Sequence, residues 1–178
     1  LLVYKLPDRW MLVVNAANAE KDFAWLMAVL TKKVVMDFDL PGREIDVAPI
    51  LRDLKAVEAG KDRKADIALQ GPKSLEIMQT LAGNDEKLKQ KLANLRKWHF
   101  VEASLAGIPM IICRSGYTGE AWGFEVYLHP DQAVAFWNLL LDKGKAFGIQ
   151  PTGLGARDST RTESGFPLYG HELAGPWD

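Results

Sequence analysis

The chain has 178 residues, 48% of them hydrophobic and 25% charged, and its net charge is −1. This length fits one large domain or two small lobes, and the composition is ordinary for a globular protein. No basic run gathers on a predicted face and no stretch approaches about 18 consecutive apolar residues, which argues against nucleic-acid binding, anionic-membrane binding and a transmembrane helix.

The N-terminal part predicts a β-hairpin followed by a helix. Leu1–Leu6 and Trp10–Val14 have the character of strands, and "PDR" between them contains turn formers. Asn15 or Asn18 is suited to cap the helix that follows. Its apolar residues recur at helical spacing, at Phe23, Leu26, Met27 and Leu30.

The middle of the chain predicts a strand and a short helix, then a strand with two helices. In chain order these segments are residues 33–40 (ended by Pro41-Gly42), 50–57, 65–70, 72–82 and 85–95. Pro72 suits the first turn of its helix. In the last helix lysines alternate with leucines, a pattern typical of a solvated face.

The C-terminal part predicts a second hairpin, a strand and two helices. The hairpin turns at Ala106-Gly107, and the strand covers residues 124–128. The next helix begins at Pro130, and the last covers residues 154–164. The residues expected to face inward on the Pro130 helix are Val134, Trp137, Leu140 and Leu141.

The order of hairpin, helix, strand and helix appears roughly twice along the chain. It predicts an α+β fold of two lobes with mixed or antiparallel sheets flanked by helices, and not one doubly wound parallel sheet. We place the lobe boundary near residues 55–64.

The stretch "GYTGEAWGFEVYL", residues 116–128, contains the most informative polar residue. Its last part alternates apolar and polar residues, which places Glu125 on the strand face opposite Phe124 and Val126. The glycines before it would let another group approach the backbone closely. A carboxylate beside a glycine-rich turn is therefore a candidate ligand-binding group.

Common catalytic and metal motifs do not fit this chain. His99, His129 and His171 are far apart and lack neighbours at ligand spacing, so we expect no metal site. "GLGARD" lacks the third glycine of a dinucleotide loop, and neither a phosphate loop nor a GxSxG elbow occurs. Cys113 lies in the apolar run "IPMIIC", which predicts a small buried residue and no disulfide. A single cysteine fits a reducing compartment, the cytoplasm.

Five residues remain that could form a ligand site: Tyr4, Asn15, Tyr117, Glu125 and Arg157. A carboxylate can accept two parallel hydrogen bonds from a planar heterocycle, a guanidinium can hold a carboxylate, and tyrosines supply flat walls. Spacing alone favours the simpler interpretation, in which Glu125 and Arg157 form a surface ion pair and the tyrosines belong to the core.

Four segments, in this order, give a resemblance to a known family. "VVNAANAEKDFAWL", "IALQGPKS", "GYTGEAWGFEVYL" and "GLGARDSTRTESGFPLYGHEL" resemble the aminomethyltransferases (T-proteins) of the glycine cleavage system and their tetrahydrofolate-dependent relatives. They span nearly the whole chain. The resemblance implies the folate-binding part of the T-protein fold, with tetrahydrofolate as cofactor.

The resemblance also implies roles for individual residues. Glu125 matches the carboxylate that contacts the pterin, and Arg157 the arginine of the same pocket. Tyr4 matches a tyrosine that lines it. Val14 and Asn15 match a segment that approaches the ligand partly through its backbone, and Tyr117 lies in the glycine-rich turn.

Three features depart from the family pattern. Ala121 and Trp122 stand where the family has one residue, which could alter the edge of the pocket. The family's catalytic aspartate directly precedes the strand that begins here at Leu1, so we expect it just before the chain. The family's C-terminal barrel lobe is expected to be absent. We therefore treat residues 1–178 as a region truncated at both ends.

The implied reaction transfers a one-carbon unit to N5 of tetrahydrofolate, with a lipoyl carrier protein as the donor. Two alternatives remain: a tetrahydrofolate-dependent demethylase of a small methylated substrate, and a non-catalytic folate-binding module. An aspartate upstream of Leu1 would favour an enzyme. We expect residues 1–178 alone to have no measurable transferase activity and at most weak folate binding, because one side of the pocket would be open to water.

Overall fold

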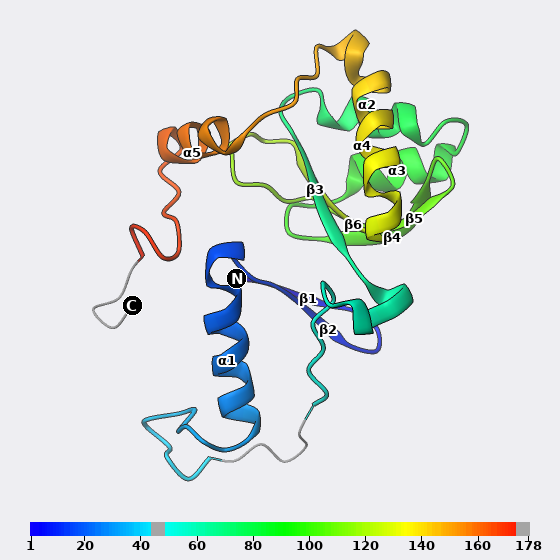
Figure 1. Ribbon diagram of the computed structural model, residues 1–178. Helices are drawn as coiled ribbons and strands as arrows, with labels where there is room; N and C mark the ends of the chain where they lie inside the picture. Colours follow the sequence, from blue (N-terminus) through cyan, green and yellow to red (C-terminus); the bar gives the residue numbers. More distant parts are fainter. Residues whose placement is uncertain (44–48, 174–178) are drawn as a thin grey trace. The chain divides into compact units, whose positions relative to one another are not determined.

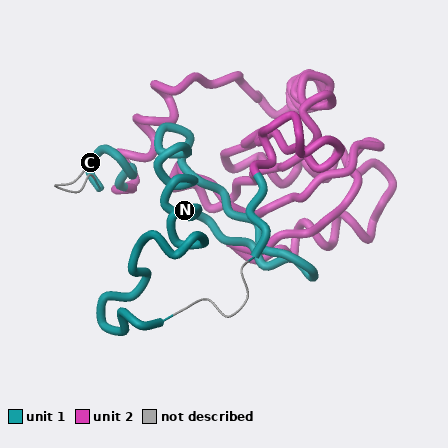
Figure 2. The backbone as a smooth tube through the Cα atoms, turned by 60° about the horizontal axis from the view of Figure 1, so that its bottom comes forward, with its two compact units in different colours: residues 1–52, 167–178 teal, residues 53–166 magenta. Residues whose placement is uncertain are grey.

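The computed structural model describes residues 1–43 and 49–173, and the chain divides into two compact units (Figures 1 and 2). Unit 1 consists of Leu1–Arg52 and Pro167–Asp178, and unit 2 of Asp53–Phe166. Helices combine with sheets in which every strand pairing is antiparallel, which confirms the predicted α+β class.

Unit 1 begins with the predicted hairpin and helix. Strands β1 (Leu2–Lys5) and β2 (Trp10–Val13) pair antiparallel, and a short 3₁₀ turn leads into helix α1 (Ala19–Leu30). The side chain of Asn15 accepts a hydrogen bond of 3.0 Å from the backbone N–H of Ala17, as its predicted capping role requires.

The segment after unit 2 returns to the first turn of α1. The side-chain amide of Asn18 donates to the carbonyl oxygen of Tyr169 at 3.1 Å, and the Tyr169 hydroxyl donates to Asp22 at 3.2 Å. The ammonium of Lys21 lies 5.1 Å from the centre of the Tyr169 ring. Asn18 therefore joins two chain segments, while Asn15 has the capping role.

Two predicted elements of this region were wrong. Residues 33–40 form turns and bends, because the Asp37 carboxylate accepts from the backbone N–H groups of Asp39 and Leu40 at 3.1 and 3.2 Å and also pairs with Arg43. Such local bonds compete with strand pairing. The helix predicted over residues 50–57 is irregular there, and a 3₁₀ segment forms instead over Val57–Asp62.

Unit 1 keeps much apolar surface uncovered. None of the residues of α1 is buried, although its sequence is rich in apolar side chains. The large hydrophobic residues of unit 1 that remain exposed are Leu1, Val3, Trp10, Leu12, Phe23, Trp25, Met27, Val35, Phe38, Leu40, Ile50 and Leu173.

Unit 2 is built on a four-stranded antiparallel sheet with the strand order β3-β6-β5-β4. Its strands are β3 (Ala65–Gln70), β4 (Phe100–Leu105), β5 (Ile108–Cys113) and β6 (Gly123–Leu128). Strands β4 and β5 meet at the predicted turn, where Ala106 and Gly107 have φ angles of 50° and 81°. Positive φ at both central residues is the geometry of a tight hairpin turn.

Three helices cover one face of this sheet and form the core of unit 2 with it. They are α2 (Ser74–Leu81), α3 (Glu86–Asn94) and α4 (Pro130–Gly144). Phe124 and Val126 of β6 point into this core, as the alternation in the sequence predicted. Glu125 is consequently on the opposite face. A well-packed sheet therefore fixes the outward position of Glu125.

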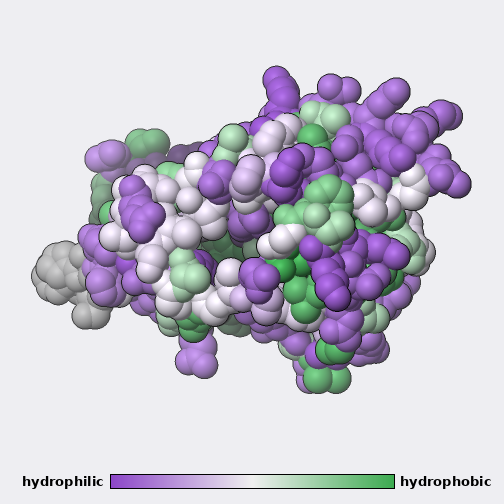
Figure 3. Space-filling view, turned by 90° about the horizontal axis from the view of Figure 1, so that it is seen from above, coloured by the Kyte–Doolittle hydropathy of each residue, from purple (hydrophilic) through white to green (hydrophobic). Residues whose placement is uncertain are grey.

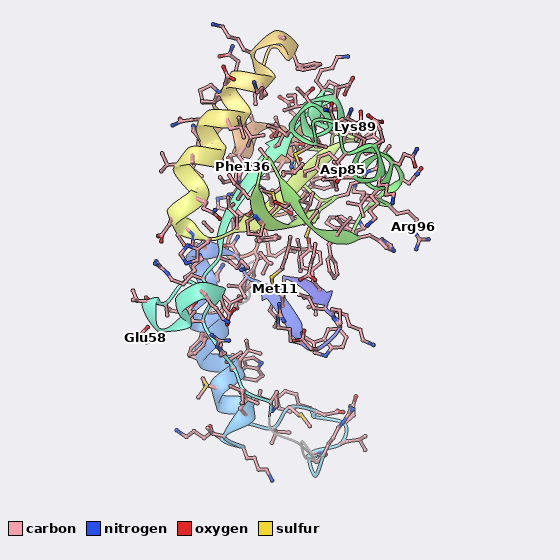
Figure 4. All side chains as sticks on the ribbon, turned by 90° about the vertical axis from the view of Figure 1, so that its right-hand side faces the viewer. Met11, Glu58, Asp85, Lys89, Arg96 and Phe136 are labelled. Carbon is pink, nitrogen blue, oxygen red and sulfur yellow. The ribbon has the colours of Figure 1, made fainter. Side chains whose placement is uncertain are left out.

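The inward face of α4 differs from the prediction. Phe136 and Leu140 are the buried residues, at 0% and 3% exposure, and Phe136 points from α4 toward the sheet (Figure 4). Val134 and Trp137, which we expected to face inward, are exposed. The prediction was right for Leu140, whereas Phe136 takes the inward position expected of Val134 and Trp137.

The surface of the chain carries both hydrophilic and hydrophobic side chains. Figure 3 shows one face on which hydrophilic side chains are interrupted by hydrophobic patches. Within the part of the chain that the structure describes, no helix is long and apolar enough to cross a membrane.

The single cysteine offers a direct check on the packing of unit 2. Cys113 ends β5 and is completely buried, as predicted. Complete burial denies a reagent access to the thiol. We expect native protein to react with a thiol reagent far more slowly than protein unfolded in denaturant, as measured by absorbance or mass. Equally fast labelling of both states would contradict the packing.

Candidate functional site

The candidate site lies on the face of the unit 2 sheet opposite the three helices, where Cys113 and Tyr127, neighbours of Glu125, are buried. Glu125, at the centre of β6, is half-buried there. The hydroxyl of buried Ser115 donates a short hydrogen bond to Oε2 of Glu125. A carboxylate held in this way keeps one orientation, and its other oxygen remains available to a ligand.

Gln70, at the end of β3, ties the glycine-rich turn to the sheet. Its side-chain amide donates to the carbonyl oxygens of Ser115 and Phe124 at 3.2 and 3.4 Å. Its side-chain oxygen accepts from the hydroxyl of Thr118 at 3.3 Å. One side chain thereby fixes the backbone on both sides of Glu125.

The glycines of the turn make room for this glutamine. A Cβ atom added to Gly116 or to Gly123 would overlap the side-chain amide of Gln70. The group that approaches the backbone closely here is therefore Gln70. The glycines serve the site by letting that side chain position the segment from Ser115 to Glu125.

A second carboxylate accompanies Glu125 on the same face. Asp66 lies opposite Tyr127 in the β3–β6 ladder and Ala68 lies opposite Glu125, so Asp66 is a diagonal neighbour of Glu125. The Asp66 side chain is accessible to solvent, yet the surrounding protein atoms remove part of its hydration. This desolvation, together with the negative charge of Glu125, raises the pKa of Asp66 to about 7, while Lys55 and Arg157 oppose the rise.

The raised pKa has a consequence for stability. The folded protein holds a proton on Asp66 between pH 4 and pH 7 that the unfolded chain releases, so the free energy of unfolding falls as the pH rises through this range. We expect Asp66→Asn to remove this fall and to stabilise the complete protein at pH 8 by about 1 kcal/mol, a discounted value because water reaches the carboxyl.

Denaturant unfolding of both proteins at pH 4.5 and pH 8 measures this effect, with roughly these two pH values chosen to bracket the titration. The gain from Asp66→Asn should appear at the higher pH alone. A gain of equal size at both values would show that Asp66 does not titrate in this range.

The turn also carries an aromatic pair. The rings of Tyr117 and Phe166 stack with their centres 5.6 Å apart and an angle of 24° between their planes. The hydroxyl of Ser164, just after helix α5 (Leu154–Glu163), donates to the carbonyl oxygen of Thr118 at 3.0 Å. These contacts connect the glycine-rich turn to the end of α5.

Arg157 lies on α5 and is exposed. Among the described residues it forms no ion pair with Glu125, but its positive charge lowers the pKa of Asp66. The structure therefore brings Glu125, Asp66 and Arg157 into electrostatic range within unit 2. Arg157 keeps its guanidinium available to a ligand.

The other residues of the predicted site belong to unit 1. Tyr4, in β1, is buried, with 4% exposure. Val14 and Asn15 follow β2 directly, and both are half-buried. The side-chain oxygen and the backbone carbonyl oxygen of Asn15 accept hydrogen bonds from the N–H groups of Ala17 and Asn18, at 3.0 and 3.1 Å.

The segment Ala121-Trp122, which is one residue longer than in the family pattern, is held by stacking of Trp122 on Arg114. The guanidinium of Arg114 lies 3.6 Å from the centre of the Trp122 ring and donates to the carbonyl oxygens of Leu95 and Ala121 at 2.8 and 3.1 Å. The recess beside this turn measures about 10 Å³, roughly the room for one water. Trp122 thus packs on the protein, and the insertion does not fill the face beside Glu125.

Among the described residues, no group of three or more His, Cys, Asp and Glu side chains could hold a metal ion. The site offers carboxylates that accept hydrogen bonds, a guanidinium that donates them and aromatic rings, a set that suits a planar organic ligand with hydrogen-bonding edges.

The comparison with protein families identifies the class of domain to which this sheet and its glycine-rich turn belong. The profile described as GCVT N-terminal domain matches residues 1–177. The chain belongs to this family.

Relatives and a solved structure agree with this assignment. The chain is 39% identical over 175 residues to the aminomethyltransferase of Caldanaerobacter subterraneus subsp. tengcongensis, covering 97% of this chain and 40% of the relative. It is 40% identical to that of Exiguobacterium sibiricum over 175 residues, with 98% and 40% covered. The crystal structure of glycine cleavage system aminomethyltransferase T from Bartonella henselae matches with a TM-score of 0.60 and 30% identity, over 93% of this chain and 36% of that one. The chain therefore spans about two fifths of the length of these relatives.

Three residues of the site were missed in the sequence: Asp66, Gln70 and Ser115. Gln70 belongs to the motif "IALQGPKS" and could have been identified from the sequence, because it is a polar residue at the end of a strand whose residues alternate. Asp66 occupies an outward position of the same strand. Its proximity to Glu125 depends on the β3–β6 register, which periodicity does not provide.

Proposed function

We propose that this chain forms the folate-binding part of an aminomethyltransferase of the glycine cleavage type. The observation that carries the proposal is the oriented Glu125 carboxylate, which Ser115 holds on the sheet face opposite the three helices, beside the glycine-rich turn. The family assignment over residues 1–177 and relatives named aminomethyltransferase support it.

In this proposal Glu125 accepts hydrogen bonds from the ring N–H and amino group of the pterin of tetrahydrofolate. Two charge-assisted bonds from one planar edge give both affinity and orientation. Arg157 binds an anionic group of the ligand or steadies the negative charge of the site. Tyr117 contributes a flat wall, which its stacking on Phe166 keeps in place.

From unit 1, Tyr4 lines the ligand and Val14 and Asn15 approach it through their backbone. The proposed donor is an aminomethyl group on the lipoyl arm of a carrier protein, and the proposed compartment is the cytoplasm. The carbon leaves both sulfur and nitrogen and bonds to N5 and N10 of tetrahydrofolate, so that the products are methylenetetrahydrofolate, ammonia and the free thiol of the lipoyl arm. The contribution of this chain is to position the acceptor nitrogen, and positioning supplies a large part of the rate of such transfers.

The test uses the complete protein. Calorimetry with tetrahydrofolate should give saturable binding, and an aminomethylated lipoyl carrier should release ammonia only when tetrahydrofolate is present. Binding without ammonia release would reject the transferase and leave a folate-binding module. Release of a methylated folate from a small methylated substrate would instead identify a demethylase.

A further inference from the structure

The second carboxyl of the site has no assigned task. Asp66 projects from the same sheet face as Glu125, one diagonal step away in the β3–β6 register. Its side chain is accessible and forms no hydrogen bond or ion pair with the described residues. Glu125 differs, because Ser115 occupies one of its oxygens. An accessible carboxyl beside a fixed one is available for a ligand.

The surroundings of Asp66 favour the protonated form of its carboxyl. Glu125 approaches it from β6, and its negative charge makes a second negative charge costly. The Lys55 and Arg157 charges act in the opposite direction, from the segment before β3 and from α5. Glu102 lies on the same face but at the far edge of the sheet, on β4. Desolvation is the dominant effect, and it raises the pKa of Asp66 to about 7.

A pterin edge needs both kinds of hydrogen-bonding group. Its pyrimidinone ring presents a carbonyl oxygen, a ring N–H and an amino group in one row, which is an acceptor followed by two donors. The ionised carboxylate of Glu125 can satisfy the two donors. The carbonyl oxygen then requires a donor next to that carboxylate, and a protonated carboxyl is one.

We propose that Asp66 is a specificity-determining residue of the folate site, which in its protonated form donates a hydrogen bond to the pterin carbonyl while Glu125 accepts from the neighbouring N–H and amino groups. This inference rests on the proposed function, since it assumes that Glu125 binds a pterin. Together the two carboxyls match the whole hydrogen-bonding row of the ring.

The arrangement makes ligand affinity depend on pH. At pH 6 Asp66 is protonated and donates. When it ionises at higher pH, a carboxylate faces the carbonyl oxygen, so the hydrogen bond is lost and two acceptors oppose each other. Affinity of the complete protein for 5-formyltetrahydrofolate, a probe that retains this ring edge, should therefore fall roughly tenfold between about pH 6 and pH 8.5.

Two substitutions at the same position separate the donor from the charge. Asp66→Asn supplies an amide donor at every pH, so it should bind the probe nearly as tightly as wild type at pH 6 and keep that affinity at pH 8.5. Asp66→Ala should bind roughly tenfold more weakly at pH 6 and show little dependence on pH. Glu102→Gln, on the same sheet face but at its far edge, should retain the wild-type profile.

Calorimetric titration of these four proteins at both pH values tests whether Asp66 donates to the ligand. Wild-type binding that does not change with pH, or an Asp66→Asn variant that keeps the wild-type profile, would overturn the role of Asp66 and leave the folate site intact. Absence of probe binding by wild type at both pH values would overturn the proposed function and this inference together. Circular dichroism of each variant verifies that it is folded.

Discussion

Glu125→Gln is expected to weaken tetrahydrofolate binding by the complete protein by roughly 10- to 100-fold, the effect of losing one or two charge-assisted hydrogen bonds. Glutamine keeps the shape of the side chain but replaces one acceptor oxygen with an N–H donor. Because Ser115 donates to the side chain at position 125, the remaining oxygen is drawn toward Ser115. The amide donor then faces the N–H groups of the ligand, and the contact becomes repulsive.

Calorimetry at neutral pH measures this loss, and the matched control is Glu102→Gln. Glu102 is exposed, lies on the same face of the sheet and is carried by the edge strand β4. The same chemical change at that position should leave the affinity within about twofold, because exposed charges at such distances are screened. An unchanged affinity of Glu125→Gln would show that the pterin does not contact this carboxylate.

The strand β6 of the unit 2 sheet was predictable because its apolar and polar residues alternate, which reflects that one face of the sheet packs on the hydrophobic core. Strand β6 placed Phe124 inward and Glu125 outward in the sequence and in the structure. The turn at Ala106-Gly107 was predictable because Gly107 suits the positive φ that a tight hairpin requires, although Ala106 has to adopt a positive φ as well.

What the sequence did not provide was the relation between segments. Periodicity cannot tell which residue of β3 lies beside Glu125, so the role of Asp66 emerged only from the strand register. The hydrophobic run at residues 33–40 was misread as a strand, because the hydrogen bonds of the Asp37 side chain stabilise a turn there. Recognition of Glu125 as a functional group depended on the family resemblance, because spacing alone favoured a surface ion pair.

The apolar residues of helix α4 also did not reveal, from the sequence alone, which face of the helix packs on the sheet. The helix contains more apolar residues than one face can bury, so the choice between two stripes depends on which of them meets the sheet. In the structure Phe136 is fully buried within the core of unit 2, and Val134 is 72% exposed. The two residues are only two positions apart on α4 and therefore provide a strict comparison.

Phe136→Ala is accordingly expected to lower the free energy of unfolding by about 3–5 kcal/mol, since it removes a large buried ring and leaves a cavity. Val134→Ala should change it by less than about 0.5 kcal/mol, because the side chain already lies in water and alanine is a better helix former than valine. Chemical denaturation of the complete protein, followed through the transition of unit 2, measures both. If the two substitutions cost the same, or if Val134→Ala costs more, then α4 packs through the stripe that the sequence alone suggested, and the core that supports Glu125 and Asp66 is arranged differently from the one described.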